Sequence, residues 1–392
     1  MQDYQKYFIE NLKHYINNEK ITLRPDADYK QLFEFARLHN LGGVLFCAAS
    51  TAENTDAIPT EAYSAAQEGF FDLVYSANLQ QQIYAELKTA LTAAGLRFVP
   101  FKGAVLRDYY PVPESRAMGD IDVLIDIENR GNVRRVLKEA GFTCKNSNGP
   151  VWDYEKGGVL IEVHTAILNG KVGKTNAPEF FADAIERADF GEGLIGTFPA
   201  DYHFAFLLAH AAHHFWFHGA GIRFILDFAV AIKYMGASPE AALEMLEAAG
   251  LGEFAKNLLT VCKKWFDIGI DYGCNTEKTE AFLCSFGAFG TDFRNSGTVV
   301  ARKALEEGKE GGAAARRLAL LFPSYEKMKE IPYIKFIEGR RYLTPLAWGY
   351  RLGYNLKNRR AFMLKTAKQL GTDEAEQAAK AELEFLKEIG LD

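Results

Sequence analysis

Residues 119–125, with the sequence GDIDVLI, constrain this chain more than any other segment. Asp120 and Asp122 alternate there with Ile121 and Val123, and the β-branched and leucine neighbours predict a buried strand. Side chains two apart on a strand share a face, so both carboxylates project to one side of the strand. Like charges on a buried face need a positive group between them, and hard cations such as Mg²⁺ prefer oxygen ligands. The pattern predicts a metal site; a hydrated surface strand is the simpler alternative.

Upstream of the acids, the chain has a turn suited to an anion. A short apolar strand at residues 96–101 leads into Lys102, Gly103 and Ala104, which open a predicted helix. Backbone amides at a helix N-terminus can hold an anion, and a preceding glycine permits close approach. The turn therefore predicts a phosphate-sized site next to the acids.

Two cations lie near this turn in the sequence. Lys102 is in the turn itself, and Arg116 lies between the turn and the acids. Either side chain can contribute charge to a phosphate site. Ion pairs with neighbouring acids, such as Asp108 or Glu114, explain the same residues equally simply.

A second acid-bearing strand follows. Residues 151–156 and 159–167 are predicted strands, joined as a hairpin across a Gly-Gly pair. In the second of them, Glu162 and His164 alternate with apolar residues, as the acids do at 120 and 122. Glu162 is therefore a candidate third carboxylate from an adjacent strand. Because a single acid in a strand is common, an ordinary strand residue explains Glu162 about as well.

The two flanks of this portion are predicted to be helical. Apolar residues recur at three- and four-residue spacing in residues 1–95 and again from about Pro199 onward. Short strands between long helical flanks indicate an α+β protein. The sequence shows no internal repeat.

Histidines and an Arg/Asp pair mark the helical part after residue 199. His210, His214 and His218 follow one another at four-residue steps and lie on one helix face. Imidazole is a common zinc ligand, so a zinc site is conceivable. A buried polar stripe or a cleft wall is the simpler interpretation, with His210 and His214 as cleft residues. Arg223 and Asp227, also four apart, are expected to form an intrahelical ion pair.

Charge limits the partners. The chain of 392 residues carries a formal net charge of −6, which argues against binding to extended nucleic acid. A local basic region near the C-terminus could still hold an RNA end or an anionic sugar. Its arginines are Arg340, Arg341, Arg351, Arg359 and Arg360.

The cysteines and the N-terminus bear on the compartment. The five cysteines are scattered and form no CxxC pair, as is typical of reduced thiols in a cytosolic protein. The N-terminal segment lacks the apolar stretch of a signal peptide, and charged residues interrupt the most apolar region. We therefore expect a cytoplasmic protein with no membrane partner.

The residues FKGAVL, then a Tyr, a Pro and an Arg, then GDIDVLI and later IEVH, resemble the nucleotidyltransferases of the DNA polymerase β-type superfamily. The resemblance is closest to a poorly characterised bacterial branch, the nucleotidyltransferase family proteins. It is more distant to the toxin nucleotidyltransferases of abortive-infection systems. It is strongest over residues 97–164 and extends more weakly to the His-rich helix and the Arg223/Asp227 pair.

The resemblance implies roles for the matching positions. Gly103 and Ala104 would lie in the turn that holds the triphosphate of an NTP. Asp120 and Asp122 would bind two Mg²⁺ ions, and Glu162 would hold one metal and help to deprotonate the attacking hydroxyl. Phosphoryl and nucleotidyl transfer need the charge neutralisation that two metal ions supply.

The turn departs from the superfamily pattern. The superfamily usually has Gly followed by Gly or Ser, whereas this chain has Lys102-Gly103-Ala104. The hydroxyl that contacts phosphate is therefore missing, and Lys102 or Arg116 could replace it with a charge. His164, His210 and His214 complete the expected nucleotide-binding set.

Together these features predict a small mixed-sheet nucleotidyltransferase core at residues 77–170. A helical region would precede it at residues 1–76 and another would follow at residues 171–392. The expected reaction is Mg²⁺-dependent transfer of an NMP group from an NTP to a hydroxyl of a small molecule, an RNA end or a protein. A non-catalytic protein that keeps the fold as a binding or partner module is the alternative. Glu162 distinguishes them, because only the enzyme needs it within metal-bridging distance of the two aspartates.

Overall fold

The structure is a computed structural model, and it describes residues 1–147, 149–285, 287–288, 322–329, 331–358 and 373–392. The chain forms two compact units, residues 1–292 with 389–392 and residues 293–388. The three-part division at residues 76 and 170 remains a prediction. Arg359 and Arg360 lie outside the described residues. None of the described helices is long and apolar enough to cross a bilayer.

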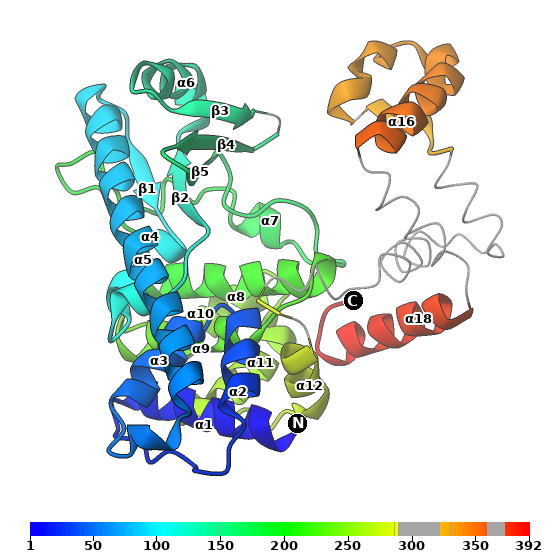
Figure 1. Cartoon of the computed structure of the whole chain (residues 1–392). Coiled ribbons are helices and arrows are strands. Elements are labelled where there is room, and N and C mark those ends of the chain that lie inside the picture. Colours follow the sequence, from blue (N-terminus) through cyan, green and yellow to red (C-terminus); the bar gives the residue numbers. More distant parts are fainter. Residues whose placement is uncertain (148, 286, 289–321, 330, 359–372) are drawn as a thin grey trace. The chain divides into compact units, whose positions relative to one another are not determined.

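The first unit contains one five-stranded mixed sheet among helices, which confirms the α+β class (Figure 1). Its strands are β1 (Phe98–Pro100), β2 (Asp120–Ile125), β3 (Thr143–Asn146), β4 (Val151–Lys156) and β5 (Val159–His164). The strand order is β1-β2-β5-β4-β3. Among these five strands, the β2–β5 pairing is parallel and the other three pairings are antiparallel.

The helices of the first unit lie before, within and after the sheet region. Those before it are α1 (Asp3–Asn17), α2 (Tyr29–Leu38), α3 (Gly42–Ser50) and α4 (Thr60–Ala93). Those within and just after it are α5 (Gly103–Leu106), α6 (Arg130–Glu139) and α7 (Ala177–Phe180). The later ones are α8 (Ala200–Phe217), α9 (Ile222–Lys233), α10 (Pro239–Ala248), α11 (Gly252–Phe266) and α12 (Glu277–Ser285).

In the second unit, the described helices include α15 (Tyr325–Lys329), α16 (Thr344–Asn358) and α18 (Asp373–Glu388). Four buried residues form a small core of their own there: Met328, Ile334, Ile337 and Ala347. The predicted basic residues Arg340, Arg341 and Arg351 belong to this unit. Arg341 already forms an ion pair with Glu326 at 2.8 Å, so part of its charge is neutralised within the unit.

Glycines end the helices and turn the hairpin at the predicted places. Gly95 after α4 and Gly141 after α6 have φ of 69° and 82°, the left-handed conformation that closes a helix. Gly157 and Gly158 both have positive φ and form the two-residue connection between β4 and β5. The hairpin follows from this pair, because a side chain at either position would be strained.

The two faces of the sheet have different neighbours. On one face, α4 and α6 pack on a core that includes Ile121 and Val123 from β2 and Ile161 and Val163 from β5. Alternation then turns Asp120, Asp122, Glu162 and His164 to the opposite face, which is where α8 and α9 lie. The predicted placement of Asp120 and Asp122 opposite Ile121 and Val123 is confirmed.

Candidate active site

The parallel pairing of β2 and β5 brings the acids of two strands together. Asp122 lies directly opposite Glu162 in the register, and Leu124 lies opposite His164. Because both strands alternate in step, Asp122, Glu162 and His164 project from one face of the sheet. The structure therefore joins the two acid-bearing segments that the sequence places 40 residues apart.

One oxygen of Asp122 is the centre of the cluster. Lys102 donates from Nζ to Asp122 Oδ1 at 2.7 Å, and His164 donates from Nε2 to the same oxygen at 2.8 Å. His164 Nε2 also lies 3.3 Å from Glu162 Oε2. Asp122 is only 2% exposed. Burial by itself raises the pKa of this carboxyl, but the Lys102 ammonium and the His164 hydrogen bond outweigh it, so the pKa is lowered and Asp122 is ionised.

Asp122, Glu162 and His164 can hold a cation. One ligand atom from each lies within 4.8 Å of the others, and within the described part of the chain no other His, Cys, Asp or Glu group meets that criterion. Two carboxylate oxygens suit Mg²⁺, and the imidazole suits a transition metal such as Mn²⁺. The residues present therefore fit a divalent cation. Glu162 therefore lies within metal-bridging distance of Asp122, as the enzyme hypothesis requires, while Asp120 lies outside this close group.

Asp120 differs from the expected metal set. It lines the same cavity but is not in the close group with Asp122 and Glu162. Burial, followed by the neighbouring charge of Asp122, raises the pKa of Asp120 to about 6. Asp120 is thus the carboxyl of the site whose charge changes near neutral pH.

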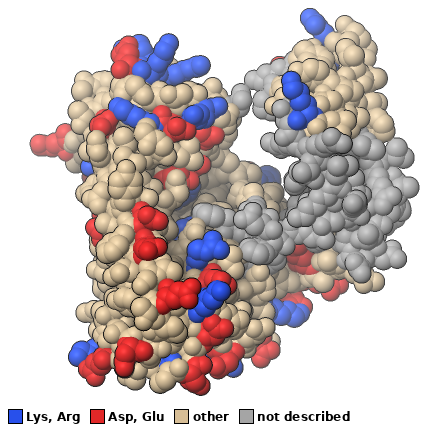
Figure 2. All heavy atoms as spheres, in the orientation of Figure 1, with Lys and Arg blue, Asp and Glu red and all other residues tan. Residues whose placement is uncertain are grey.

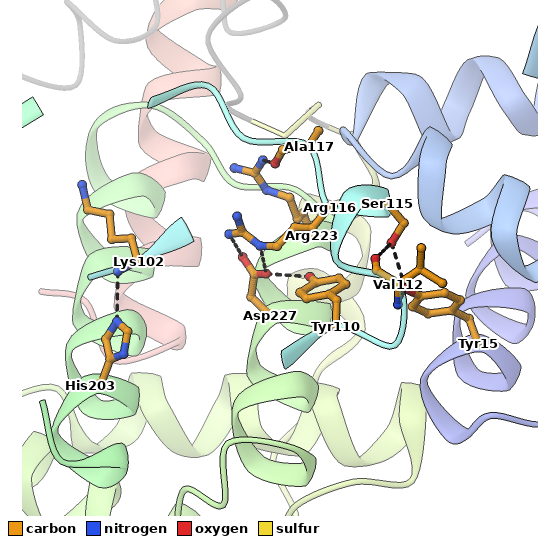
Figure 3. Close-up of polar contacts among 10 residues, drawn as sticks. All are labelled: Tyr15, Lys102, Tyr110, Val112, Ser115, Arg116, Ala117, His203, Arg223 and Asp227. Atoms are coloured by element: carbon orange, nitrogen blue, oxygen red, sulfur yellow. Dashed lines mark hydrogen bonds and ion pairs between the residues drawn. The ribbon is translucent and has the colours of Figure 1, made fainter. Parts of the chain in front are cut away.

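The turn after β1 is more constrained than its sequence suggests. Lys102 has φ of 51°, a conformation that costs a lysine on the order of 1–3 kcal/mol. Its N–H donates to Nε2 of His203 on α8 at 3.0 Å, so that backbone donor is not available to an anion (Figure 3). The following helix α5 has only four residues, and Ala104 packs against the core of the sheet. The predicted anion turn is thus present, but it offers an anion fewer free backbone N–H donors than the N-terminus of a long helix would.

Arg116 is fixed by a residue that the sequence places far away. Its Nε and Nη2 donate to the two carboxylate oxygens of Asp227 at 2.9 and 3.0 Å, and Tyr110 donates its hydroxyl to the same carboxylate at 2.6 Å (Figure 3). Arg223 donates to the carbonyl of Ala117 at 3.3 Å. The packing of α9 against the segment before β2 thus gives Asp227 a bidentate partner, Arg116, that the sequence did not predict. The positive charge of Arg223 also helps to lower the pKa of Asp227, so the predicted Arg223–Asp227 pair is one part of a larger network.

The histidines of α8 form a neutral wall. His210 and His214 line the cavity, with ring centroids 4.6 Å apart. Burial, and then nearby positive groups, lower the pKa of His214 to about 3 and hold that of His210 well below its usual value. His218 lies just beyond the end of α8. These rings do not form a metal-holding group with one another among the described residues, so the cleft-wall interpretation is the one the geometry supports.

A cavity of about 280 Å³ collects these side chains. Its floor is the acid face with Lys102, and its other walls come from α8 and α9. The predicted site residues that line it are Lys102, Gly103, Arg116, Asp120, Asp122, Glu162, His210 and His214. Ala104 lines a neighbouring cavity of about 260 Å³ that shares Gly103 and Met118. His164 lies behind the floor, 4% exposed, with its ring edge against Phe101.

Sequence reasoning missed two residues of this region. His203 supports the turn, and Tyr110 completes the Asp227 network. His203 precedes His210 by seven residues, which is two helical turns, so helical spacing places it on the same face as His210 and His214. Nothing local in the sequence marks Tyr110, whose partner lies 117 residues away.

Comparison with known proteins agrees with this geometry. The searches of curated proteins and of solved structures each find no match. A family model described as an uncharacterised nucleotidyltransferase matches residues 25–267, which is more than half of the chain and includes every residue of the cavity. The chain therefore belongs to this uncharacterised nucleotidyltransferase family.

Proposed function

We propose that this protein transfers an NMP group from an NTP to a hydroxyl of an acceptor with the help of Mg²⁺. The observation that carries the proposal is the register of β2 and β5, which places Asp122 opposite Glu162 on a face lined by a cavity. An acid pair of this kind within a nucleotidyltransferase family is what metal-assisted nucleotidyl transfer requires.

We assign a separate role in the proposed reaction to each group of residues in the cavity. Asp122 and Glu162, with Asp120 beside them, would hold the metal ions, and bound metal would neutralise charge on the departing pyrophosphate. Glu162 is 25% exposed, so its carboxylate can accept a proton from an incoming hydroxyl. Lys102, with Arg116 held rigid by Asp227, would face the triphosphate near Gly103 and Ala104. The neutral imidazoles of His210 and His214 would contact the nucleotide without adding charge.

One contact favours the alternative, a non-catalytic protein that keeps the fold. The Lys102 ammonium already neutralises Asp122, so that buried carboxylate has a partner without any metal. A binding module would need no more than this. Nucleotide binding therefore has to be measured directly.

The size of the cavity, the charge of the chain and its cysteines support the proposed acceptor and compartment. The cavity of about 280 Å³ is small for a ligand site, which favours a small molecule or a single chain end, such as an RNA end or a protein side chain, over a bulky acceptor. The net charge of −6 and the interspersed acidic and basic side chains on the face of the first unit in Figure 2 argue against an extended nucleic acid. The five cysteines are free thiols, which suits the cytoplasm.

The test is calorimetric binding of each of the four NTPs with Mg²⁺ to the wild type, Asp122→Asn and Asp126→Asn. Asp126 follows the far end of β2 and pairs with Arg97, so it is a matched carboxylate outside the cavity. We expect metal-dependent binding by the wild type and Asp126→Asn, and its loss in Asp122→Asn. If the folded wild type binds none of the four NTPs, the enzyme proposal fails and the binding-module alternative stands.

A further inference from the structure

We propose that Lys102 is an exchangeable counter-ion: its ammonium holds Asp122 while the metal site is empty, and moves to the phosphates of the nucleotide when a divalent cation binds. This inference rests on the proposed function for the second half of the exchange. The first half, competition between Lys102 and a cation, depends only on the acid cluster.

The competition follows from the contacts of a single atom. Asp122 Oδ1 accepts from Lys102 at 2.7 Å and from His164 at 2.8 Å. A carboxylate oxygen has about two lone-pair sites, so both are in use. Asp122 belongs to the group whose ligand atoms can hold a metal. A cation bound through this oxygen must therefore displace one of the two donors.

Lys102 is the donor that is able to leave. His164 is 4% exposed and its ring is packed against Phe101, so its position is fixed by the core. The Lys102 ammonium sits at the end of a flexible four-carbon stem, and the lysine lines the cavity. A compact hydrated charge on a flexible stem can move to a new partner without disturbing the sheet.

The backbone of Lys102 is held in place, while its side chain, 16% exposed, lines the cavity. The positive φ of 51° and the hydrogen bond from its N–H to His203 at 3.0 Å fix the turn. A strained residue that the surrounding structure maintains is a mark of a functional position. The stem therefore always starts from the same point, between the acid face and the neighbouring Gly103.

Charge explains why the exchange is useful. Without metal, the ammonium prevents Asp122 from being a buried, unpaired charge. With metal, the same ammonium would be repelled by the cation and attracted by a triphosphate in the same cavity. Metal and nucleotide would then bind cooperatively. The metal would release the Lys102 ammonium for the nucleotide, and the phosphates would accept the ammonium that the metal displaces.

Calorimetry with Mn²⁺ alone tests the competition. We compare the wild type, Lys102→Met and Lys88→Met; Lys88 is a lysine of α4 that lies over the Tyr84 ring, outside the acid cluster. Lys102→Met is expected to bind Mn²⁺ on the order of tenfold more tightly than the wild type, because no ammonium has to be displaced. Lys88→Met is expected to match the wild type. Equal or weaker Mn²⁺ binding by Lys102→Met overturns the inference.

The second half is tested with the four NTPs in the presence of Mg²⁺. Lys102→Met is expected to bind them on the order of tenfold more weakly than the wild type, so the two effects have opposite signs. If Lys102 only stabilised the fold, its substitution would weaken the binding of both Mn²⁺ and NTP. That result overturns the exchange. If the wild type binds Mn²⁺ but no NTP, the proposed function fails and the exchange onto phosphate fails with it; tighter Mn²⁺ binding by Lys102→Met then still supports the competition.

The wild type provides a readout that does not depend on the folding of a variant. Amine-selective labelling followed by mass spectrometry reports the accessibility of Lys102 and of Lys88. Adding Mn²⁺ should increase labelling of Lys102 several-fold, and adding an NTP with the metal should reduce it again, while Lys88 stays constant. Unchanged labelling of Lys102 under saturating Mn²⁺ overturns the exchange.

Discussion

Two buried carboxylates, Asp122 and Asp227, each meet a cation, and the two pairs differ in geometry. Asp227 accepts hydrogen bonds from Arg116 through both oxygens and from Tyr110 through one, so rigid, planar donors hold both ends of the carboxylate. Asp122 meets the flexible Lys102 through a single oxygen. The first arrangement fixes the segment before β2 against α9, and the second leaves a carboxylate that can change partners.

The rigid pair predicts a large effect on stability. Asp227→Ala removes the partner of Arg116, which is 6% exposed, and leaves an uncompensated buried charge. We expect the free energy of unfolding to fall by about 3–5 kcal/mol. Urea denaturation measures it.

The control is a pair with similar chemistry on the surface. Asp183 pairs with Arg187 at 2.9 Å, with both side chains about half exposed. Asp183→Ala is expected to cost less than about 1 kcal/mol. If both substitutions cost the same, the Arg116–Asp227 pair does not stabilise the fold.

At the residue scale, the sequence predicted positions better than partners. Alternation correctly places Asp120 and Asp122 on one face, because the two-residue period of a strand is a local rule. The partner of Arg116 lies 111 residues further along the chain. The sequence favoured Asp108, Glu114 or a phosphate instead, since nothing local shows which helix packs against this segment.

At the scale of elements, local signals gave the strands, helices and turns, but not the order of the strands. Gly95, Gly141 and the Gly157–Gly158 pair ended helices and turned a hairpin where predicted. The pairing of β2 with β5 is a contact between segments separated by two strands and a helix. That pairing puts Glu162 beside Asp122, and it is the step that the resemblance supplied and the residue pattern alone left open.

The turn between β1 and α5 gives a prediction at this scale. A Cβ at Gly103 would lie 2.7 Å from Nη1 of Arg116 and 2.9 Å from Sδ of Met118. Arg116 cannot easily move because Asp227 holds it. Gly103→Ala should therefore lower the free energy of unfolding by about 1–3 kcal/mol through overpacking.

A second glycine of the same cavity is the matched control. Around Gly119 nothing lies within 4 Å of an added Cβ. Gly119→Ala is expected to change stability by no more than about 0.5 kcal/mol. Thermal melts of both variants decide it: equal stability of Gly103→Ala and the wild type would mean that the turn is looser than the structure shows.

At the scale of the whole molecule, the proposed chemistry belongs to one unit. The family match at residues 25–267 lies within the first unit, and so does every residue that lines the cavity. Residues 389–392 return to that unit, where the N–H of Lys174 donates to the carbonyl of Asp392 at 2.6 Å and Leu391 is fully buried. The first unit is therefore stabilised by the last residues of the chain as well as by its own sheet.

Buried histidines of the first unit predict how it responds to acid. Burial lowers the pKa of five of them: His39, His203, His210, His213 and His214. For His39 and His203 the pKa falls from 6.5 to about 4. A base whose folded pKa lies below its unfolded pKa binds more protons when unfolded. Its contribution to stability is therefore present above pH 6.5 and is lost as the pH falls from there toward 4.

Two groups of the acid cluster act in the opposite direction. The pKa of Asp120 is raised to about 6 and that of His164 is raised above its usual value. Each group therefore contributes stability that grows as the pH falls through its own folded pKa. Five histidines outnumber these two groups. Each of the five histidines should lower the free energy of unfolding by on the order of 1–2 kcal/mol between pH 7 and pH 5. The net change is therefore a loss of stability.

Thermal melts at pH 7 and pH 5 test this, and His39 isolates one contribution. Its Nδ1 accepts the N–H of Ile222 at 3.2 Å, away from the cavity, so protonation there breaks a helix contact without touching the acid cluster. The wild type should melt at least about 5 °C lower at pH 5 than at pH 7. His39→Gln keeps an acceptor without a titrating ring, and should lose about 1–2 kcal/mol less over the same interval. A wild type with the same melting temperature at both pH values would contradict the neutral state of these histidines, and with it the uncharged wall opposite the acids.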